Sequence, residues 1–330
     1  MTTLVTGATG FACAHVVHAL AEADEEVLAL DLAPPSEEYR QYLGRLEDRA
    51  RFVTADVLDT AALLELAKRY QVRRFIHGAA ITPTTEMERA IPQRIVNVNL
   101  MGTVSLLEVA RAVSADRFVL MSSTGIYAPQ ADRDAVVTER SPVQTQGLYM
   151  ICKTAGEQLL RRYKDLYDLS TVSGRMSSIY GPMERATATR SRPSVIYTLV
   201  RACLRGQPVQ ASGMANRRCY AHAADAGLIW RHLALAAELE HDIYNVSSGR
   251  AHSLDEVLGT LRSLEPSFVF GDQPSARDAV QVAHLGDRNV LDISRAATEF
   301  GFSPRFDLRQ GLAGYLAWAQ DHPTLFDLET

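Results

Sequence analysis

The sequence is poor in cysteine, and this and two other absences exclude several classes of protein. Its four cysteines form neither a CxxC pair nor a dense pattern, so neither a metal site nor a disulfide framework is indicated. The net charge of −5 comes from interspersed acids and bases, without the basic stripe that nucleic-acid binding needs. No long apolar run occurs, so we expect no membrane-spanning helix.

The chain also lacks segments that would mark targeting or joints between domains. The first residues, MTTLVTGATGF, enter a strand-like run at once and do not resemble a signal peptide, so we expect a soluble, cytoplasmic protein. There is no internal repeat, low-complexity tract or Gly/Ser linker. What is present is 330 residues, 47% of them hydrophobic, enough for one big α/β domain or two smaller ones.

Short apolar runs alternate with segments of helical period, which predicts βαβ units and a doubly wound parallel sheet. The sequence pattern changes from residues 179–194 onward, where the expected strands become shorter and prolines more frequent. We therefore expect a dinucleotide-binding domain at 1–178 and a mostly substrate-binding lobe at 179–330, with some elements around 219–250 returning to the first domain. The expected strands are TLVTG, VLALD, RFVTAD, RFIHGAA, RFVLMSS and STVSGR, and the expected helices span residues 10–23, 59–70, 86–112 and 148–167.

Gly7 and Gly10 lie between the first strand and the first helix, where the backbone can turn tightly and present NH groups to a pyrophosphate. Asp31 closes the next strand, 24 residues after Gly7. Its carboxylate can accept both hydroxyls of an adenosine ribose and would repel a 2′-phosphate, which predicts NAD rather than NADP. The alternative is that Asp31 only caps the following loop. Cys13 replaces the third glycine of the usual pattern, and we expect it to pack there rather than react.

Tyr149 and Lys153 stand four residues apart in LYMICKTAG, so on a helix they share a face. A buried ammonium group beside a phenol lowers the phenol's pKa from about 10, which makes it a usable acid or base at neutral pH. The chain has only three lysines, and we predict that this one tunes Tyr149. The alternative is an exposed lysine on a helix whose tyrosine packs in the core.

The segment RFVLMSSTGIYA ends in three hydroxyl residues, Ser122, Ser123 and Thr124, at the carboxyl end of the fifth expected strand. A hydroxyl there can bond the substrate oxygen that Tyr149 protonates. Spacing alone does not fix which of the three does so, and capping of the backbone is the competing role for the other two.

Several segments together resemble the extended short-chain dehydrogenase/reductase family, also called the NAD-dependent epimerase/dehydratase family, and in particular its nucleotide-sugar 4-epimerases. They are TGATGF, HGAA, NVNLMGT, LMSSTGIY, YMICK and IYGP, with Asp31. Later segments such as RRCYAHAADA are similar to that family's substrate lobe, so the resemblance spans nearly the whole chain. It implies a Rossmann-type NAD-binding domain and a homodimer formed through the helices at 86–112 and 148–167.

The resemblance also implies roles for single residues. Ser123, four residues before Tyr127, would be the catalytic hydroxyl, Tyr149 the acid/base, and Lys153 the group that holds the nicotinamide ribose. Asn99 would support the helix end near the active site. The residues expected to bind the cofactor are Gly7, Thr9, Gly10, Phe11, Asp31, Asp56, Val57, Ala79, Ala80, Asn99, Tyr149 and Lys153.

The substrate pocket is less clearly marked. Ser178 occupies the place where many sugar-nucleotide members carry an asparagine. Arginines compensate, because guanidinium groups match phosphate and carboxylate oxygens, and an anionic substrate is our hypothesis. For the arginines of residues 185–192 the alternative is a solvated, mobile loop. The residues expected to bind the substrate are Thr124, Ser178, Arg185, Arg190, Arg218 and Arg277.

One activity of the family can be rejected, and three functions then remain open. A 4,6-dehydratase of this family carries an Asp-Glu pair after the catalytic hydroxyl, whereas Ser123 is followed by Thr124 and Gly125, so we reject that activity. The leading hypothesis is oxidation of a sugar-like secondary alcohol, as a transient step in nucleotide-sugar epimerisation. Its rival is a net NAD-dependent dehydrogenase or carbonyl reductase acting on a smaller alcohol or ketone. The third is a non-catalytic dinucleotide-binding protein.

Overall fold

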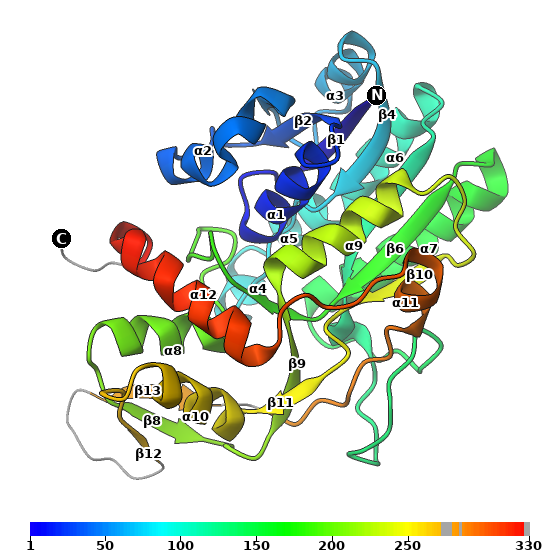
Figure 1. Cartoon of the computed structure of the whole chain (residues 1–330). Helices are drawn as coiled ribbons and strands as arrows, with labels where there is room; N and C mark the ends of the chain where they lie inside the picture. The colour runs from blue at the N-terminus through cyan, green and yellow to red at the C-terminus, as the bar shows by residue number, and fades with distance from the viewer. Residues whose placement is uncertain (272–278, 284–285, 327–330) are drawn as a thin grey trace.

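The computed structural model describes residues 1–271, 279–283 and 286–326 (Figure 1). Its largest sheet is parallel and contains β1 (Thr2–Thr6), β2 (Glu26–Asp31), β3 (Ala50–Thr54), β4 (Val72–His77), β5 (Arg117–Ser123), β6 (Thr171–Met176) and β10 (Ile243–Val246). The strand order is β10-β6-β5-β4-β1-β2-β3. This order confirms the doubly wound fold and places the topological switch between β1 and β4, where such sheets bind ligands.

Helices cover both faces of this sheet (Figure 1). One layer consists of α1 (Phe11–Ala21) and α9 (Ala223–Leu235), and the other of α3 (Thr60–Arg69), α6 (Gly102–Ala112) and α7 (Leu148–Tyr167). Alternate residues of one strand enter opposite cores: Val5 packs under the first layer and Leu4 under the second. Burial on both faces explains why the predicted strands read as nearly continuous apolar runs.

The single helix predicted at 86–112 is wrong, because the segment is broken into shorter pieces. Ile91 has a φ of −135° and a ψ of 45°, outside the helical region. The ring of the following Pro92 disfavours helical geometry at the residue before it, while proline itself is well suited to begin a helix. The pieces are α4 (Thr85–Ala90), α5 (Pro92–Val96), the π-helical turn η2 (Asn97–Met101) and α6.

Two smaller sheets and several helices build the second lobe, at the lower part of Figure 1. Three helices, α8 (Val195–Leu204), α10 (Leu254–Leu264) and α12 (Leu308–Asp321), pack around a core that includes Leu199, Leu258 and Leu316. The chain then returns to the large sheet through α9 and β10. The strands are β7 (Ser178–Tyr180), β8 (Val209–Ser212), β9 (Arg217–His222), β11 (Ala251–Ser253), β12 (Phe270–Gly271) and β13 (Val280–Ala283).

The remaining helices complete the description. They are α2 (Glu37–Leu43), η1 (Gly44–Arg49), η3 (Thr124–Ile126), α8 (Val195–Leu204), α10 (Leu254–Leu264), α11 (Ser294–Phe300), α12 (Leu308–Asp321) and η4 (Pro323–Phe326). In the described part of the chain, no helix combines the length and the apolar character needed to cross a membrane.

Candidate active site

A cleft of about 740 Å³ opens at the carboxyl ends of the central strands, beside the switch between β1 and β4. Most residues predicted to bind the cofactor line it. They are Gly7, Gly10, Phe11, Asp31, Asp56, Val57, Ala79, Ala80, Tyr149 and Lys153. Thr9 and Asn99 do not line the cleft. Thr9 instead donates hydrogen bonds to Asp31, and Asn99 is hydrogen-bonded to the loop that carries Ala79 and Ala80.

The turn after β1 fits a dinucleotide phosphate. Gly7 has a φ of +71°, and a Cβ atom there would lie 2.8 Å from the Ala79 backbone, so no other residue can take this position without strain. Gly10 precedes α1, whose first NH groups receive no side-chain cap. Free NH groups at the start of a helix, beside backbone that no side chain covers, form an anion site suited to a pyrophosphate.

Asp31 both caps its own turn and lines the cleft, so its capping bonds do not exclude the predicted contact with a ribose. Its Oδ2 atom accepts hydrogen bonds from the backbone NH and the hydroxyl of Thr9, at 2.9 and 2.8 Å. Its Oδ1 atom accepts one from the NH of Leu32 at 2.7 Å. A carboxylate offers roughly four acceptor positions, and the cleft is where the remaining capacity would meet a ribose. Thr9 thus orients Asp31.

Asn99 holds the loop that follows β4. Its side-chain oxygen accepts a hydrogen bond from the NH of Ile81 at 2.7 Å, and its NH2 group donates to the Ile81 carbonyl at 2.8 Å. This pair of bonds ties the loop to η2, and the loop carries Ala79 and Ala80 on the cleft wall. The role at a helix end that the family resemblance implies for Asn99 stays a prediction.

Tyr149 and Lys153 lie on one face of α7, and both line the cleft. The Lys153 Nζ atom lies 5.5 Å from the centre of the Tyr149 ring. Burial lowers the pKa of Lys153 to about 8, and its side chain is only 2% exposed. The exposed-lysine alternative is therefore wrong.

The predicted direction of the Tyr149 pKa is also wrong. Burial raises it to about 12, because a phenolate loses more solvation than a phenol when water is excluded. The opposing charge that lowers this pKa is Arg190 rather than Lys153. The sequence could not reveal this, because Arg190 reaches the cleft from a loop 41 residues away along the chain.

The structure separates the three hydroxyls at the end of β5. Ser122 donates to Glu157 Oε1 at 2.6 Å, and Thr124 donates to the Met176 carbonyl at 3.2 Å. Ser123 instead accepts a hydrogen bond, from the NH of Gly125 at 3.1 Å. Within the described ranges no acceptor takes the Ser123 proton, so this hydroxyl can donate to a substrate oxygen.

A second pocket, of about 410 Å³, adjoins the cleft on the side of the second lobe. Ser123, Thr124, Ser178 and Arg218 line it. The cleft and this substrate-side pocket share one wall, formed by Met150, Met176, Ser177 and Ser178. A molecule in the pocket would therefore adjoin one in the cleft across this wall, with Ser123 lining the pocket and Tyr149 lining the cleft.

The arginines predicted to bind substrate divide between the two cavities. Arg185 and Arg190 line the larger cleft, whereas Arg218 lines the substrate-side pocket. Arg192 also reaches the cleft, but its side chain is largely exposed and lies 3.9 Å from Glu86. Arg277 lies outside the described residues.

Sequence reasoning missed a buried ion pair between α7 and β6, formed by Glu157 and Arg175. Glu157 accepts two hydrogen bonds from Arg175, at 3.0 and 2.7 Å, and one from Ser122. The buried Glu157 carboxylate needs these partners, because an unpaired carboxylate in the core would be costly. Its signal was present: Glu157 follows Lys153 by four residues and so lies on the same face of α7.

Cys13 fits because of a glycine on the neighbouring strand end. A Cβ atom at Gly78 would lie 2.3 Å from the Cys13 Sγ atom and 2.7 Å from the Met121 Sδ atom. Burial raises the pKa of the Cys13 thiol to about 12, so it stays protonated and unreactive. The packing role predicted for this cysteine agrees with these contacts.

We expect Gly78→Ala to destabilise the protein by about 2 kcal/mol, because overpacking a close-packed core typically costs 1–3 kcal/mol. Adding Cys13→Ala should recover part of that loss, since it removes the nearer of the two sulfur atoms. Urea unfolding followed by circular dichroism measures both effects. Gly259→Ala is the matched control, because a Cβ atom there would meet nothing within 4 Å. Equal stability of Gly78→Ala and the wild type would contradict the packing account.

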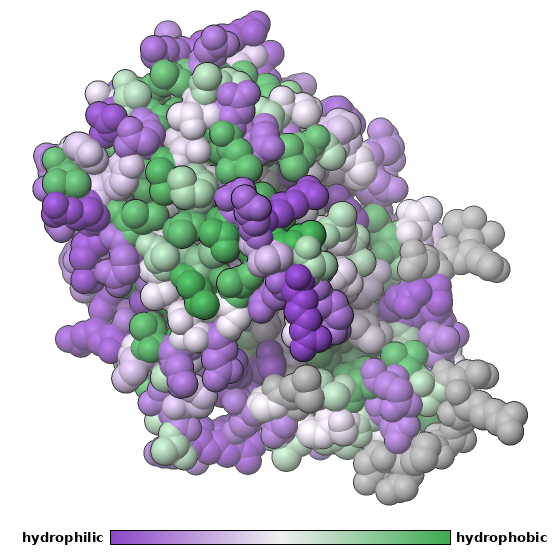
Figure 2. Space-filling view, turned by 180° about the vertical axis from the view of Figure 1, so that it is seen from behind, coloured by the Kyte–Doolittle hydropathy of each residue, from purple (hydrophilic) through white to green (hydrophobic). Residues whose placement is uncertain are grey.

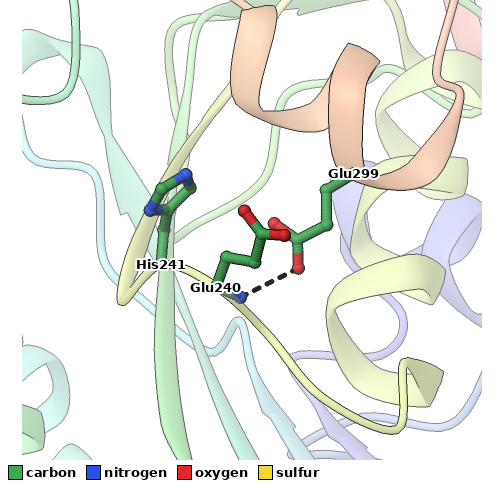
Figure 3. Close-up of side chains that lie close together, drawn as sticks. All are labelled: Glu240, His241 and Glu299. Carbon is green, nitrogen blue, oxygen red and sulfur yellow. Dashed lines mark hydrogen bonds between the residues drawn. The ribbon is translucent and has the colours of Figure 1, made fainter.

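Two groups of polar side chains away from Tyr149 do not form a catalytic site. His77 is buried with its Nδ1 atom 2.8 Å from the Thr6 hydroxyl, and burial lowers its pKa to about 3. Figure 3 shows Glu240, His241 and Glu299 close together beside α11. The two Glu299 oxygens accept hydrogen bonds from the NH of Glu240 and the hydroxyl of Tyr244, and Glu240 is exposed, so we assign no metal ion to this group.

Comparison with known proteins agrees with this geometry. A family model described as the NAD dependent epimerase/dehydratase family matches residues 3–247. The UDP-glucose 4-epimerase of Mycolicibacterium smegmatis is 28% identical, over 95% of this chain and 96% of that protein. UDP-glucuronate 4-epimerase 1 of Arabidopsis thaliana is also 28% identical, over 96% of this chain and 76% of that protein.

A solved structure shares the fold. The UDP-glucose 4-epimerase of Thermotoga maritima, crystallised with UDP-glucose, superposes with a TM-score of 0.80 at 21% identity. The superposition covers 98% of this chain and 100% of that one. The likeness extends over the sheet and the second lobe together.

Proposed function

The chain belongs to the NAD dependent epimerase/dehydratase family, and from this membership we propose that it epimerises a nucleotide sugar through a transient keto intermediate. It is an NAD-dependent enzyme of the extended short-chain dehydrogenase/reductase type. The observation that carries the proposal is the shared wall between the two cavities, with Tyr149 on the cleft side and Ser123 on the pocket side. Such an arrangement lets one substrate carbon face the cofactor while its oxygen faces both hydroxyls.

Bound NAD would accept a hydride from the substrate carbon and return it to the opposite face of the sugar. The cradle at Gly7 and the free NH groups of α1 would hold its pyrophosphate, Asp31 its adenosine ribose, and Lys153 its nicotinamide ribose.

The protein's own groups handle the proton. At neutral pH the Tyr149 phenol, with its pKa near 12, keeps its proton and can give it to a keto oxygen. In the forward direction the phenolate would take the proton of the substrate hydroxyl as the hydride leaves the carbon, so the phenol must first release its own proton to solvent, which nearby positive charge makes easier. Arg190 is the cation whose charge lowers the pKa of Tyr149, and Lys153 lies one helical turn from the tyrosine on the same face of α7. Ser123 would donate its free proton to the same substrate oxygen and hold it in place.

The substrate would lie in the pocket of about 410 Å³, with Arg218 facing its anionic part. The two curated relatives described above are named for UDP-sugars, so UDP-glucose and UDP-glucuronate are the first compounds to test, followed by GDP- and dTDP-sugars. Epimer formation is measured by chromatography and NADH by absorbance at 340 nm. We expect epimerisation without accumulation of NADH.

Net NADH formation without an epimer would favour the rival dehydrogenase, and a smaller alcohol would then be sought. The absence of both, in a protein that still binds NAD, would favour a non-catalytic dinucleotide-binding protein. Smaller alcohols are therefore added to the same assay, and an epimer, net NADH, or neither product with any compound then distinguishes the three hypotheses.

We also propose a homodimer formed through α6 and α7. These helices pack against each other. Figure 2 shows the molecule from behind, where hydrophobic residues lie among hydrophilic ones at the surface. Met101, Ile151, Leu166 and Tyr167 on or next to these helices are exposed and large. Burial of such residues against a second copy would remove apolar surface from water.

We expect the wild type to elute as a dimer in size-exclusion chromatography with light scattering. Ile151→Glu should shift it toward the monomer, because a charged side chain would have to be buried in the interface. Val269→Glu, at an exposed site of the second lobe, is the control that should leave the mass unchanged. A monomeric wild type would contradict this interface.

A further inference from the structure

Residues 184–194 form a strap that leaves the second lobe after β7 and lines one wall of the cleft before α8 begins. Hydrogen bonds tie it to both sides of the switch between β1 and β4. Arg185 Nη2 donates to the Thr9 carbonyl at 3.0 Å, and the NH of Thr82 donates to the Thr189 carbonyl at 2.8 Å. The strap is thus fixed to the phosphate loop and to the loop after β4.

A buried carboxylate within the strap fixes the second of its arginines. Glu184 is fully buried and accepts hydrogen bonds from Arg190 Nη2 at 2.7 Å, from the NH of Ser194 at 2.7 Å and from its hydroxyl at 2.9 Å. The Arg190 guanidinium carbon lies 5.4 Å from the centre of the Phe11 ring. Because Phe11 is the first residue of α1, this places Arg190 beside the helix end that follows Gly10.

Each of these two arginines has a nitrogen without a partner. The Nη1 atoms of Arg185 and Arg190 are buried, and among the described residues neither finds a hydrogen-bond acceptor. Burying a charged donor without a partner is costly, so an acceptor is expected in the bound state. Both atoms belong to side chains that line the cleft and contact the turn from Thr9 to Phe11.

We propose that Arg185 and Arg190 clamp the diphosphate of the bound dinucleotide against the amino terminus of α1, so that the strap retains the cofactor between turnovers. This inference rests on the NAD-dependent reaction proposed above, and it moves the two arginines from the substrate, where the sequence analysis placed them, to the cofactor. Guanidinium groups suit this task because they form paired hydrogen bonds with phosphate oxygens. Retention also matches epimerisation, in which the hydride must return to the same substrate.

The test uses Arg185→Gln, Arg190→Gln and the double variant, with binding rather than activity as the readout. Dissociation of NADH is followed by its fluorescence after dilution into excess NAD, and affinities for ADP-ribose and adenosine by calorimetry. ADP-ribose carries the diphosphate, whereas adenosine carries neither phosphate. Arg262→Gln is the matched control, because Arg262 also packs on a phenylalanine, Phe270, but on α10 in the second lobe.

We expect each single variant to release NADH about tenfold faster and to bind ADP-ribose about tenfold more weakly. This change corresponds to the loss of one charge-assisted hydrogen bond. Adenosine affinity should stay unchanged, which also shows that the variants remain folded, and Arg262→Gln should match the wild type. Unchanged ADP-ribose affinity in the double variant overturns the clamp. So does an equal loss for adenosine, which would mean general damage to the cleft.

The clamp and the proposed function fail in different ways. A wild type that binds ADP-ribose through these arginines but epimerises no nucleotide sugar leaves the clamp standing and removes the proposed function. A wild type that epimerises, while the double variant holds NADH as tightly as before, removes only the clamp. A raised KM for the sugar with unaltered NADH release would return both arginines to the substrate.

Discussion

Tyr149→Phe is expected to lower kcat by about three orders of magnitude while leaving NAD bound, because general acid–base catalysis typically contributes 10²–10⁴-fold. The substitution removes only the hydroxyl. The ring keeps its position on the cleft wall, and Lys153 keeps its place one helical turn away. Initial rates with the substrate identified in the nucleotide-sugar screen measure the effect, and chromatography of denatured protein measures the NAD that remains.

Tyr163→Phe is the matched control on the same helix. The Tyr163 hydroxyl donates to Glu108 Oε1 at 2.6 Å, on α6 and away from the cleft. Its loss should leave kcat within about twofold, as surface substitutions usually have small effects. A Tyr149→Phe enzyme as active as this control would remove the phenol from the mechanism and, with it, the assignment of the acid–base group.

Lys153→Met is expected to abolish activity and yet to stabilise the fold by about 3 kcal/mol at pH 7. The folded protein lowers the pKa of Lys153 from 10.5 to about 8, and each pKa unit corresponds to about 1.4 kcal/mol. The unfolded chain therefore binds the Lys153 proton more tightly than the folded protein does. At every pH where Lys153 is charged in both states, this difference destabilises the folded state. A methionine of similar shape carries no charge and avoids this cost.

Because the pKa of Lys153 is lowered in the folded protein, the stability difference between the wild type and Lys153→Met depends on pH in a fixed direction. Below pH 8 the wild type bears the full cost of a buried ammonium group. Between pH 8 and about 10.5 the folded protein loses that proton first, so the wild type gains stability and the advantage of Lys153→Met disappears. Urea unfolding at pH 6, 7, 8, 9 and 10 measures the difference between the two proteins.

Lys164→Met provides the comparison, because Lys164 lies on the same helix but is exposed and paired with Asp242. We expect no stabilisation from it at any of these pH values. A Lys153→Met protein that is less stable than the wild type at pH 7 would mean that contacts of the ammonium group outweigh its burial.

Local patterns in the sequence predicted the parts of the fold that depend on local geometry. The strand that ends at Asp31 and the helix that carries Tyr149 follow directly from apolar periodicity. The break at Ile91 was missed, although Pro92 marks it, because the hydrophobic pattern continues across the proline. Contacts between distant segments lie beyond such patterns, and the fit of Cys13 against Gly78 is one of them.

The site shows the same division. The pairing of Tyr149 with Lys153 comes from spacing along one helix, whereas the choice of Ser123 among three neighbouring hydroxyls came from the family resemblance. The positions of Arg185 and Arg190 come from a loop whose path depends on the second lobe, so their place in the cofactor cleft could not be derived. Ser122 and Thr124 donate their hydroxyl protons to distant partners, Glu157 and the Met176 carbonyl, whereas Ser123 has no such acceptor among the described residues. Spacing along the strand could not reveal this difference.

The return of the chain through α9 and β10 limits how this protein can be divided. A fragment that stops at residue 178 would leave the outer edge of β6 without the strand that normally pairs with it, since β10 lies there. Unpaired backbone groups along such an edge recruit other strands. The same fragment would expose the face of α1 that α9 covers. An expression trial of the nucleotide-binding half alone should therefore yield insoluble aggregates, and a soluble version would need residues 223–246 joined back to it by a linker.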